Sequence, residues 1–135
     1  MEEQKNFGSH VMIDGYGGDQ AKLDDVSLIV NFLRELPKKL QMRALADPIV
    51  MRVPKISEKD PGGISGFVII AESHISIHTF PDRGYLTADV YSCKTEMDRE
   101  RIGQYFIETF QLDADIELQY VTRGTQFYKR APLAK

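Results

Sequence analysis

The stretch of residues 64–93 constrains the fold of this chain more than any other segment. Residues 67–71 form a continuous apolar run of strand length, and in residues 74–79 polar and apolar side chains alternate. Because side chains on a β-strand point to alternate faces, this alternation predicts a strand with one buried and one polar face. Residues 81–84, Pro-Asp-Arg-Gly, have the composition of a turn, and a third strand is predicted at residues 85–92.

Three further strands and two helices are predicted outside this stretch. The strands cover residues 9–16, 48–53 and 116–121. The first helix begins near Leu23, with apolar residues at helical spacing, and Pro37 is expected to end or kink it because proline has no N–H. The second helix is expected to open at residues 95–98, Thr-Glu-Met-Asp, which resemble a capping box.

The resulting order, β-α-β-β-β-β-α-β, favours an α+β fold. It predicts a two-layer sandwich in which a mostly antiparallel sheet carries two helices packed on one face. The helix-free face would be solvated or used for dimerisation, and the polar loop at residues 54–63 would form a rim or a flap. With 135 residues, 42% of them hydrophobic, the chain is expected to form a single domain covering residues 1–135.

Charge and cysteine content narrow the classes of function. A net charge of −3 without a run of lysine or arginine argues against nucleic-acid and anionic-membrane partners and leaves a small-molecule substrate. The single cysteine cannot form an internal disulfide, and residues 1–5 lack the apolar core of a signal peptide, so we expect a cytoplasmic location. No apolar run approaches the ~18 residues that a membrane span requires.

Ser73, His78 and Cys93 are the candidate catalytic residues of the central stretch. Ser73 and His78 are five residues apart and would face opposite sides of a regular strand. They can meet only if the chain turns at Glu72 and Ser73, and the change of pattern after Ala71 predicts such a turn. The serine would then lie exposed at a strained junction, within reach of imidazole and thiol groups.

The residues alone leave other interpretations open. A lone cysteine at a strand end is most often a small buried hydrophobe. His74 and His78 on one strand face suit zinc, but a site needs at least a third protein ligand, so no metal is predicted. A non-enzymatic small-molecule-binding module would explain the sheet and helices, but not the coincidence of serine, histidine and cysteine.

Residues 64–81, followed by Gly84-Tyr85, residues 88–91 and Cys93, resemble the core of the prokaryotic S-adenosylmethionine decarboxylase proenzymes. The match joins Glu-Ser-His to a histidine five residues after the serine and a cysteine twenty residues after it. Outside the core the resemblance continues in element order, in total length and in residues 10–14, His-Val-Met-Ile-Asp.

The resemblance implies a self-cleaving proenzyme. Ser73 Oγ would attack the carbonyl of Glu72, and elimination would release residues 1–72 as the β chain. Residues 73–135, the α chain, would retain dehydroalanine, which hydrolyses to a pyruvoyl group, the self-generated cofactor. By the same resemblance, His78 takes the α-proton of Ser73 and Ser65 positions or polarises the scissile carbonyl, roles that need hydrogen-bond reach of the junction.

The resemblance also implies how decarboxylation would proceed. The pyruvoyl ketone condenses with a substrate amine, and the conjugated carbonyl accepts the electrons left when carbon dioxide departs. Cys93 matches the family's proton donor, and a thiol with that role must stay protonated at neutral pH. The family further implies a homodimer of processed protomers.

The substrate implied by the resemblance is S-adenosylmethionine, used in polyamine (spermidine) biosynthesis. Asp14 matches an acid that binds the substrate ribose, Phe80 stands where a ring stacks on adenine, and Glu72 is assigned to the substrate site as well. Family members usually carry aromatic residues where residues 57–62 here have none. Some members decarboxylate ornithine or arginine, whose distal cations could pair with acids such as Asp60, so that alternative stays open.

Overall fold

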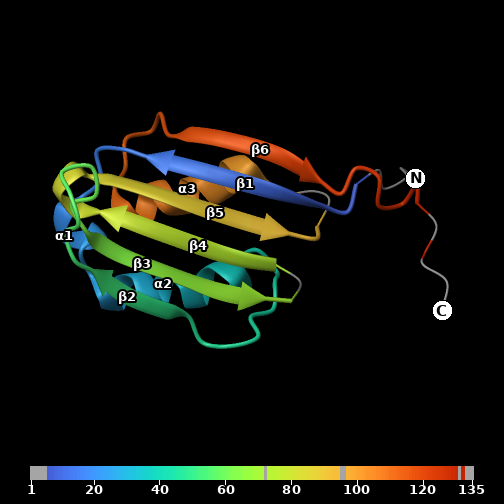
Figure 1. Ribbon diagram of the computed structural model, residues 1–135, viewed down its shortest axis with the longest axis horizontal. Helices are drawn as coiled ribbons and strands as arrows, with labels where there is room; N and C mark the ends of the chain where they lie inside the picture. The colour runs from blue at the N-terminus through green and yellow to red at the C-terminus, as the bar shows by residue number, and fades with distance from the viewer. Residues whose placement is uncertain (1–5, 72, 95–96, 131, 133–135) are drawn as a thin grey trace.

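The computed structural model describes residues 6–71, 73–94, 97–130 and 132. It forms one six-stranded sheet in the order β2-β3-β4-β5-β1-β6, and every neighbouring pair is antiparallel (Figure 1). The strands are β1 (Gly8–Gly15), β2 (Ile49–Val53), β3 (Gly63–Ile70), β4 (Ser73–Phe80), β5 (Tyr85–Ser92) and β6 (Glu117–Arg123). The helices are α1 (Gln20–Leu23), α2 (Val26–Lys39) and α3 (Arg99–Phe110), with a 3-10 turn η1 (Pro81–Arg83). The predicted α+β sandwich is confirmed.

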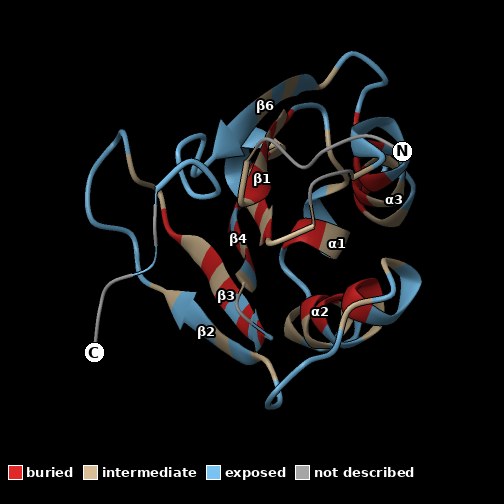
Figure 2. Cartoon of the chain, turned by 90° about the vertical axis from the view of Figure 1, so that its right-hand side faces the viewer, coloured by how far each residue is buried: buried red, intermediate tan, exposed pale blue. Residues whose placement is uncertain are grey.

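The hydrophobic core lies between the sheet and the helices, which cover one face (Figures 1 and 2). Alternate residues of the central strands point into it, and Ile75 and Ile77 of β4 are fully buried. Phe32 of α2 packs against Phe106 and Phe110 of α3, with ring centroids 4.8 and 5.2 Å apart. Each buried side chain of this size contributes about 1.5–3 kcal/mol relative to its exposed state, so this layer holds the helices on the sheet.

The first predicted helix is two helices in the structure, and Pro37 does not end it. Asp19 caps α1 by accepting from the Lys22 amide at 3.0 Å, and Asp25 caps α2 in the same way. Two caps in close succession separate the helices, so α2 begins at Val26. Pro37 lies in the last turn of α2, which continues to Lys39. There the ring removes a single backbone donor, and its burial in the core offsets that loss.

The second long helix also starts later than predicted. Asp98 is its N-cap and accepts from the Arg101 amide at 3.1 Å, so α3 begins at Arg99. Thr95 and Glu96 of the predicted capping box lie outside the described residues. In the described part of the chain no helix is long and apolar enough to cross a membrane.

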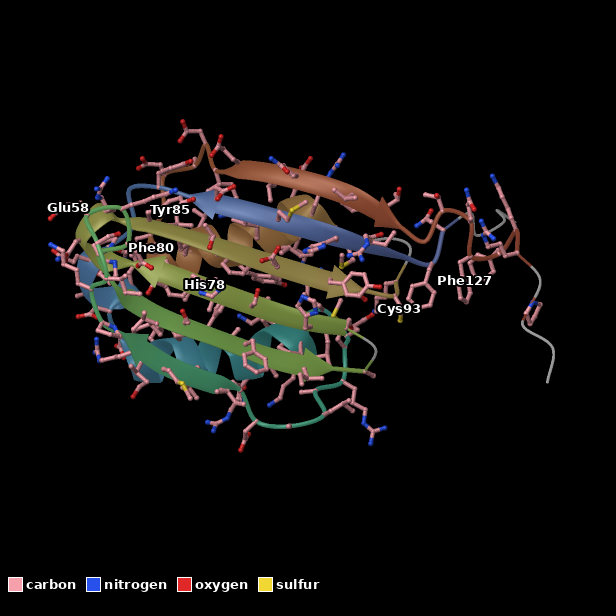
Figure 3. All side chains as sticks on the ribbon, viewed as in Figure 1. Glu58, His78, Phe80, Tyr85, Cys93 and Phe127 are labelled. Carbon is pink, nitrogen blue, oxygen red and sulfur yellow. The ribbon has the colours of Figure 1, made fainter. Side chains whose placement is uncertain are left out.

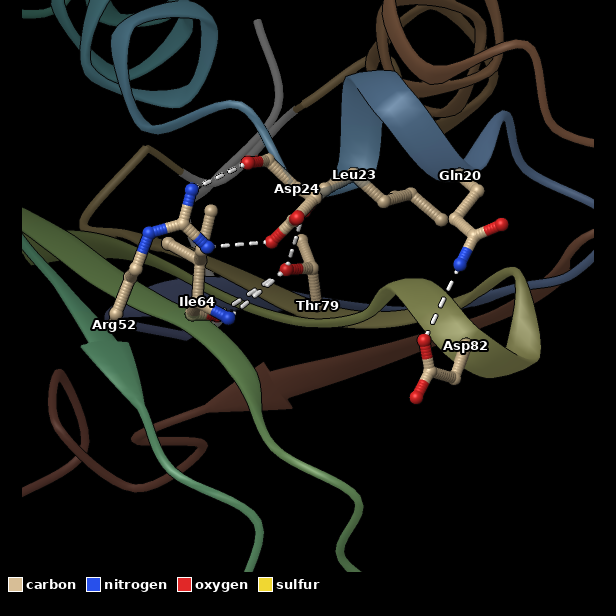
Figure 4. Close-up of polar contacts among 7 residues, drawn as sticks. All are labelled: Gln20, Leu23, Asp24, Arg52, Ile64, Thr79 and Asp82. Carbon is tan, nitrogen blue, oxygen red and sulfur yellow. Dashed lines mark hydrogen bonds and ion pairs between the residues drawn. The ribbon is translucent and has the colours of Figure 1, made fainter.

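A set of buried and peripheral polar contacts fixes α1 against the strands (Figure 4). Thr79 Oγ1 of β4 donates to the Leu23 carbonyl at 2.8 Å and accepts from the Ile64 amide at 3.1 Å. Arg52 of β2 donates to the Asp24 carboxylate at 2.6 Å and to its backbone carbonyl at 2.9 Å. Because Thr79 is buried, these bonds satisfy its hydroxyl and hold β3 and β4 in register where the strands meet α1.

We call the helix-free side of the sheet the open face. Four of its apolar side chains are exposed by 39–64%: Ile49, Met51, Phe67 and Ile69. The register places Ile49 opposite Phe67 and Met51 opposite Ser65, so these residues form one continuous patch on β2 and β3. Contiguous exposed apolar surface of this kind commonly marks an interaction site.

Candidate active site

Ser73 is the first residue of β4 and follows a tight hairpin turn. It pairs with Ile70 of β3, so residues 71 and 72 alone connect the two strands. The Ser73 side chain is half-buried, and its hydroxyl donates to the Ala71 carbonyl at 3.1 Å. The chain therefore reverses direction at this junction as predicted, but Ser73, which was predicted to lie in the turn, already belongs to β4. The expected strain is not seen in the described part of the junction, because neither Ala71 nor Ser73 has a positive φ, and Glu72 lies outside the described residues.

Cys93 lies at the same end of the sheet as Ser73. The last recorded pair of β4 and β5 is His74 with Tyr91, and one further step along both strands brings Ser92 opposite Ser73. Cys93 follows directly and is half-buried (Figure 3). Ser73 and Cys93 define what we call the Ser73 end of the sheet.

Ser65 and His78 form a hydrogen-bonded pair on the open face. They are directly opposite each other in the β3–β4 ladder, with Ser65 Oγ 2.8 Å from His78 Nδ1. His78 is exposed, and its ring is oriented by the serine. The resemblance assigned both residues to the junction at Ser73, and their contact with each other was not predicted.

The expectation that His78 reaches Ser73 is wrong within one chain. Ser73 is the first residue of β4 and so already belongs to the strand that carries His78. At about 3.3 Å per residue, five residues separate their backbones by about 16 Å, and the odd number puts their side chains on opposite faces. A single chain therefore places the serine at the same end of the sheet as the thiol but far from the imidazole.

Asp14 and Phe80 lie on the His78 side of the sheet. His78 is opposite Thr87, and Thr87 is opposite Asp14, so Asp14 shares a cross-strand row with the Ser65–His78 pair. Phe80 ends β4. We call this group the His78 end: Ser65, His78, Phe80 and Asp14.

Two tyrosines complete the His78 end, and the sequence had given them no role. Tyr85 donates to Asp14 Oδ1 at 2.8 Å and stacks on Phe80 at 5.5 Å between ring centroids. Tyr16 stacks on the other side of Tyr85 at 5.2 Å and donates to the Glu117 carboxylate. Tyr85 stood in the matched Gly84-Tyr85 pair, but its contact with Asp14 depends on strand pairing that local patterns do not reveal.

Both phenols are held in their neutral form. Burial, together with the hydrogen bond to Asp14, raises the pKa of Tyr85 to about 12. The hydrogen bond to Glu117 is the largest cause that raises the pKa of Tyr16 above its ordinary value. An ionised phenolate beside a carboxylate would be repelled, so both hydroxyls remain donors throughout the neutral and mildly alkaline range.

We expect a late phenol ionisation in alkaline titration. Phenolate absorbance should show a step near pH 12 that is absent from Tyr85→Phe, because that variant lacks the shifted group. Since the folded-state pKa is raised, the stabilisation is full below about pH 10 and is lost as the pH rises through 12. A wild-type titration complete by pH 11 in folded protein would contradict the partly buried Tyr85–Asp14 hydrogen bond.

A groove of about 640 Å³ runs along the open face and contains the Ser65–His78 pair. This volume suits a small-molecule ligand. Its lining is largely apolar and comes from β2, β3, β4 and the residue that follows β2: Ile49, Met51, Arg52, Val53, Pro54, Ser65, Gly66, Phe67, Ile69, His74, Ser76 and His78. Among the described residues, no three His, Cys, Asp or Glu side chains are grouped to hold a metal ion.

Known proteins resemble this chain over most of its length. Residues 9–124 match the family model described as S-adenosylmethionine decarboxylase. An S-adenosylmethionine decarboxylase proenzyme of Thermococcus kodakarensis is 36% identical over 111 residues, covering 82% of this chain and 73% of that protein. Proenzyme 2 of Halalkalibacterium halodurans is 36% identical over 118 residues, covering 87% of each chain.

The solved structures give the same result. The crystal structure of the adenosylmethionine decarboxylase from Aquifex aeolicus superposes with a TM-score of 0.74 at 31% identity, covering 90% of this chain and 93% of that one. Fold and sequence thus place the chain in the class of decarboxylases built on a two-layer α+β sandwich. Within that class, it belongs to the S-adenosylmethionine decarboxylase family.

Proposed function

We propose that this protein is a proenzyme that cleaves itself between Glu72 and Ser73 and then decarboxylates S-adenosylmethionine. The observation that carries the proposal is the position of Ser73, directly after a two-residue hairpin turn and at the same end of the sheet as Cys93. Membership of the family supports the substrate. The cytoplasmic location and the place in polyamine biosynthesis are part of the same proposal.

Self-cleavage needs a nucleophile, a base and water. Ser73 Oγ bonds to the carbonyl carbon of residue 72 as the amide C–N bond breaks, which gives an ester. A base then removes the Ser73 α-proton, and the ester oxygen departs with Glu72 as a carboxylate. The double bond left at residue 73 rearranges to an imine, and water replaces the nitrogen, which leaves as ammonia. The Ala71 carbonyl holds Ser73 Oγ on the hairpin side at 3.1 Å before the reaction.

The surroundings of Ser73 fit the pyruvoyl group that would result. That group supplies a ketone for the substrate amine and an adjoining carbonyl that accepts the electrons released with carbon dioxide. Residue 73 is the first residue of β4, so the strand fixes the backbone that follows the group. The residue is half-buried, which limits the access of water. We assign the delivery of a proton to the substrate carbon to Cys93, which lies at the same end of the sheet.

We propose that a second copy of the chain completes the site. Within one protomer the nucleophile and thiol lie at the Ser73 end, whereas Ser65, His78 and Asp14 lie at the other end. In a twofold dimer each contact occurs twice, so the Ser73 end of one protomer can face the His78 end of its partner at two equivalent sites. The exposed apolar patch of the open face supports pairing through that face.

The His78 end favours S-adenosylmethionine over ornithine or arginine. A carboxylate beside aromatic rings suits a ribose attached to a purine. The acidic side chains of the loop that would bind an ammonium or guanidinium group already have partners. Glu58 pairs with Lys55 at 3.3 Å, and Asp60 accepts a hydrogen bond from the Gly62 amide at 3.2 Å. Breaking these contacts would offset part of any gain from a new cation.

Carbon dioxide release from the three substrates tests this choice. We expect release from S-adenosylmethionine, with KM raised about tenfold or more in Asp14→Ala, because a hydrogen bond to a charged group contributes about 1.5–3 kcal/mol. Asp60→Ala is the matched control and should leave KM unchanged. Release from ornithine or arginine alone would overturn the substrate, while self-cleavage would still be tested separately by the mass of the chain.

A further inference from the structure

The His78 end contains a row of three aromatic rings beside two carboxylates. Tyr85 lies between Phe80 and Tyr16, with ring planes inclined by 27° in both pairs. Its hydroxyl donates to Asp14, while the hydroxyl of Tyr16 donates to Glu117. Figure 3 shows Tyr85 and Phe80 at the same end of the sheet, away from Cys93.

The position of Tyr85 argues against a stacking role with a ligand. Its ring is stacked with Tyr16 and with Phe80, so a purine would have to displace one of these rings to stack on it. Phe80 and Tyr16 each use one face in the row. The single polar atom of the Tyr85 side chain is already bonded to Asp14, so Tyr85 can act on a ligand only through that carboxylate.

The two carboxylates need the phenols for a physical reason. Asp14 of β1 is directly opposite Glu117 of β6, and like charges at paired positions repel each other. Each carboxylate accepts a hydrogen bond from a different tyrosine, which stabilises its charge. The row therefore gives each of these two neighbouring carboxylates its own hydrogen-bond donor at the rim of the site.

We propose that Tyr85 is a positioning residue: it fixes one oxygen of Asp14 and leaves the other directed to the substrate. This inference rests on the proposed function, in which Asp14 binds the ribose. A carboxylate that is already fixed loses less conformational freedom on binding than a free one, so the substrate binds more tightly. The rings on both sides of Tyr85 prevent its hydroxyl from moving away.

The variant Tyr85→Phe tests the proposal, because it keeps the stacked ring and removes the hydroxyl. We expect KM for S-adenosylmethionine to rise about five- to twentyfold, with self-cleavage and kcat within about twofold of wild type. Tyr105→Phe is the matched control: Tyr105 lies on α3, and its hydroxyl accepts from Arg101 at 2.7 Å on the helix side of the sheet. It should leave KM unchanged.

Three further readouts separate positioning from packing. Asp14→Ala combined with Tyr85→Phe should raise KM no more than Asp14→Ala alone, since the phenol acts through the carboxylate. A substrate analogue without the ribose hydroxyls should lose the effect of Tyr85→Phe. Independently of activity, Asp14→Ala should move the late phenol ionisation to lower pH, which keeps the test valid if Tyr85→Phe folds poorly.

The outcomes distinguish this inference from the proposed function. An uncleaved or inactive wild-type protein would contradict the proposed function. An active wild type together with an unchanged KM in Tyr85→Phe, or with fully additive effects in the double variant, would overturn the positioning role alone. An unshifted phenol ionisation in Asp14→Ala would overturn it as well.

Discussion

Ser73→Ala is expected to remain a single uncleaved chain of 135 residues under conditions in which wild type separates into residues 1–72 and 73–135. Alanine has no oxygen to attack the preceding carbonyl, and an amide bond does not break on this time scale without a nucleophile. Intact-mass analysis and a denaturing gel, taken over several days, measure the difference. Carbon dioxide release should fall to background in the same sample.

The control is a serine of the helix layer. Ser27 is exposed on α2, away from the open face, and Ser27→Ala should cleave at the wild-type rate. Fragments of the same masses from Ser73→Ala would show that another group breaks the chain. In that case the hairpin serine would not be the nucleophile.

Two inactive variants are expected to restore cleavage when they are combined. Ser73→Ala keeps the Ser65–His78 pair but has no nucleophile, and His78→Ala keeps Ser73 but has no base. If each site combines the Ser73 end of one protomer with the His78 end of its partner, a mixed dimer contains one complete site. In an equal mixture about half of the His78→Ala chains should cleave, because random pairing gives half of them a Ser73→Ala partner.

Different mass tags on the two variants show which of the two chains is cleaved. The cleaved chain must be the one with His78→Ala, since it alone retains the serine. Co-expression of His78→Ala with Ser65→Ala is the matched control, because both lack the same half of the site and should not restore each other. An uncleaved mixture of Ser73→Ala and His78→Ala would mean that no site is shared across protomers.

The hairpin illustrates how far the sequence predicts this site. The change from the apolar run to the alternating segment located the reversal of the chain, and the register places Cys93 at the same end of the sheet as Ser73. The turn was placed one residue too late, however, with Ser73 inside it. A shift of one residue exchanges the two faces of a strand, so this small error changed which residues His78 can reach.

Other differences arise from contacts between distant segments. The hydrogen bond of Tyr85 to Asp14 joins residues 71 positions apart, and no local pattern indicates that pairing. Pro37 was expected to end or kink a helix on local grounds, but its position in the last turn and its burial in the core outweigh that preference. The strands were predicted more accurately than the helix ends, because alternation reports burial directly, whereas caps such as Asp98 depend on single residues.

The mass of the fragment that begins at residue 73 tests the central claim most directly. The fragment should be lighter than the unmodified sequence 73–135 by the mass of ammonia, because a ketone replaces the amine of Ser73. After incubation with S-adenosylmethionine and a mild hydride reductant, it should also gain the mass of an attached, reduced substrate amine, and Ser73→Ala should give no such fragment. A fragment with an unmodified amino-terminal serine, or one that gains no mass with S-adenosylmethionine, would contradict a self-made carbonyl group that reacts with this substrate.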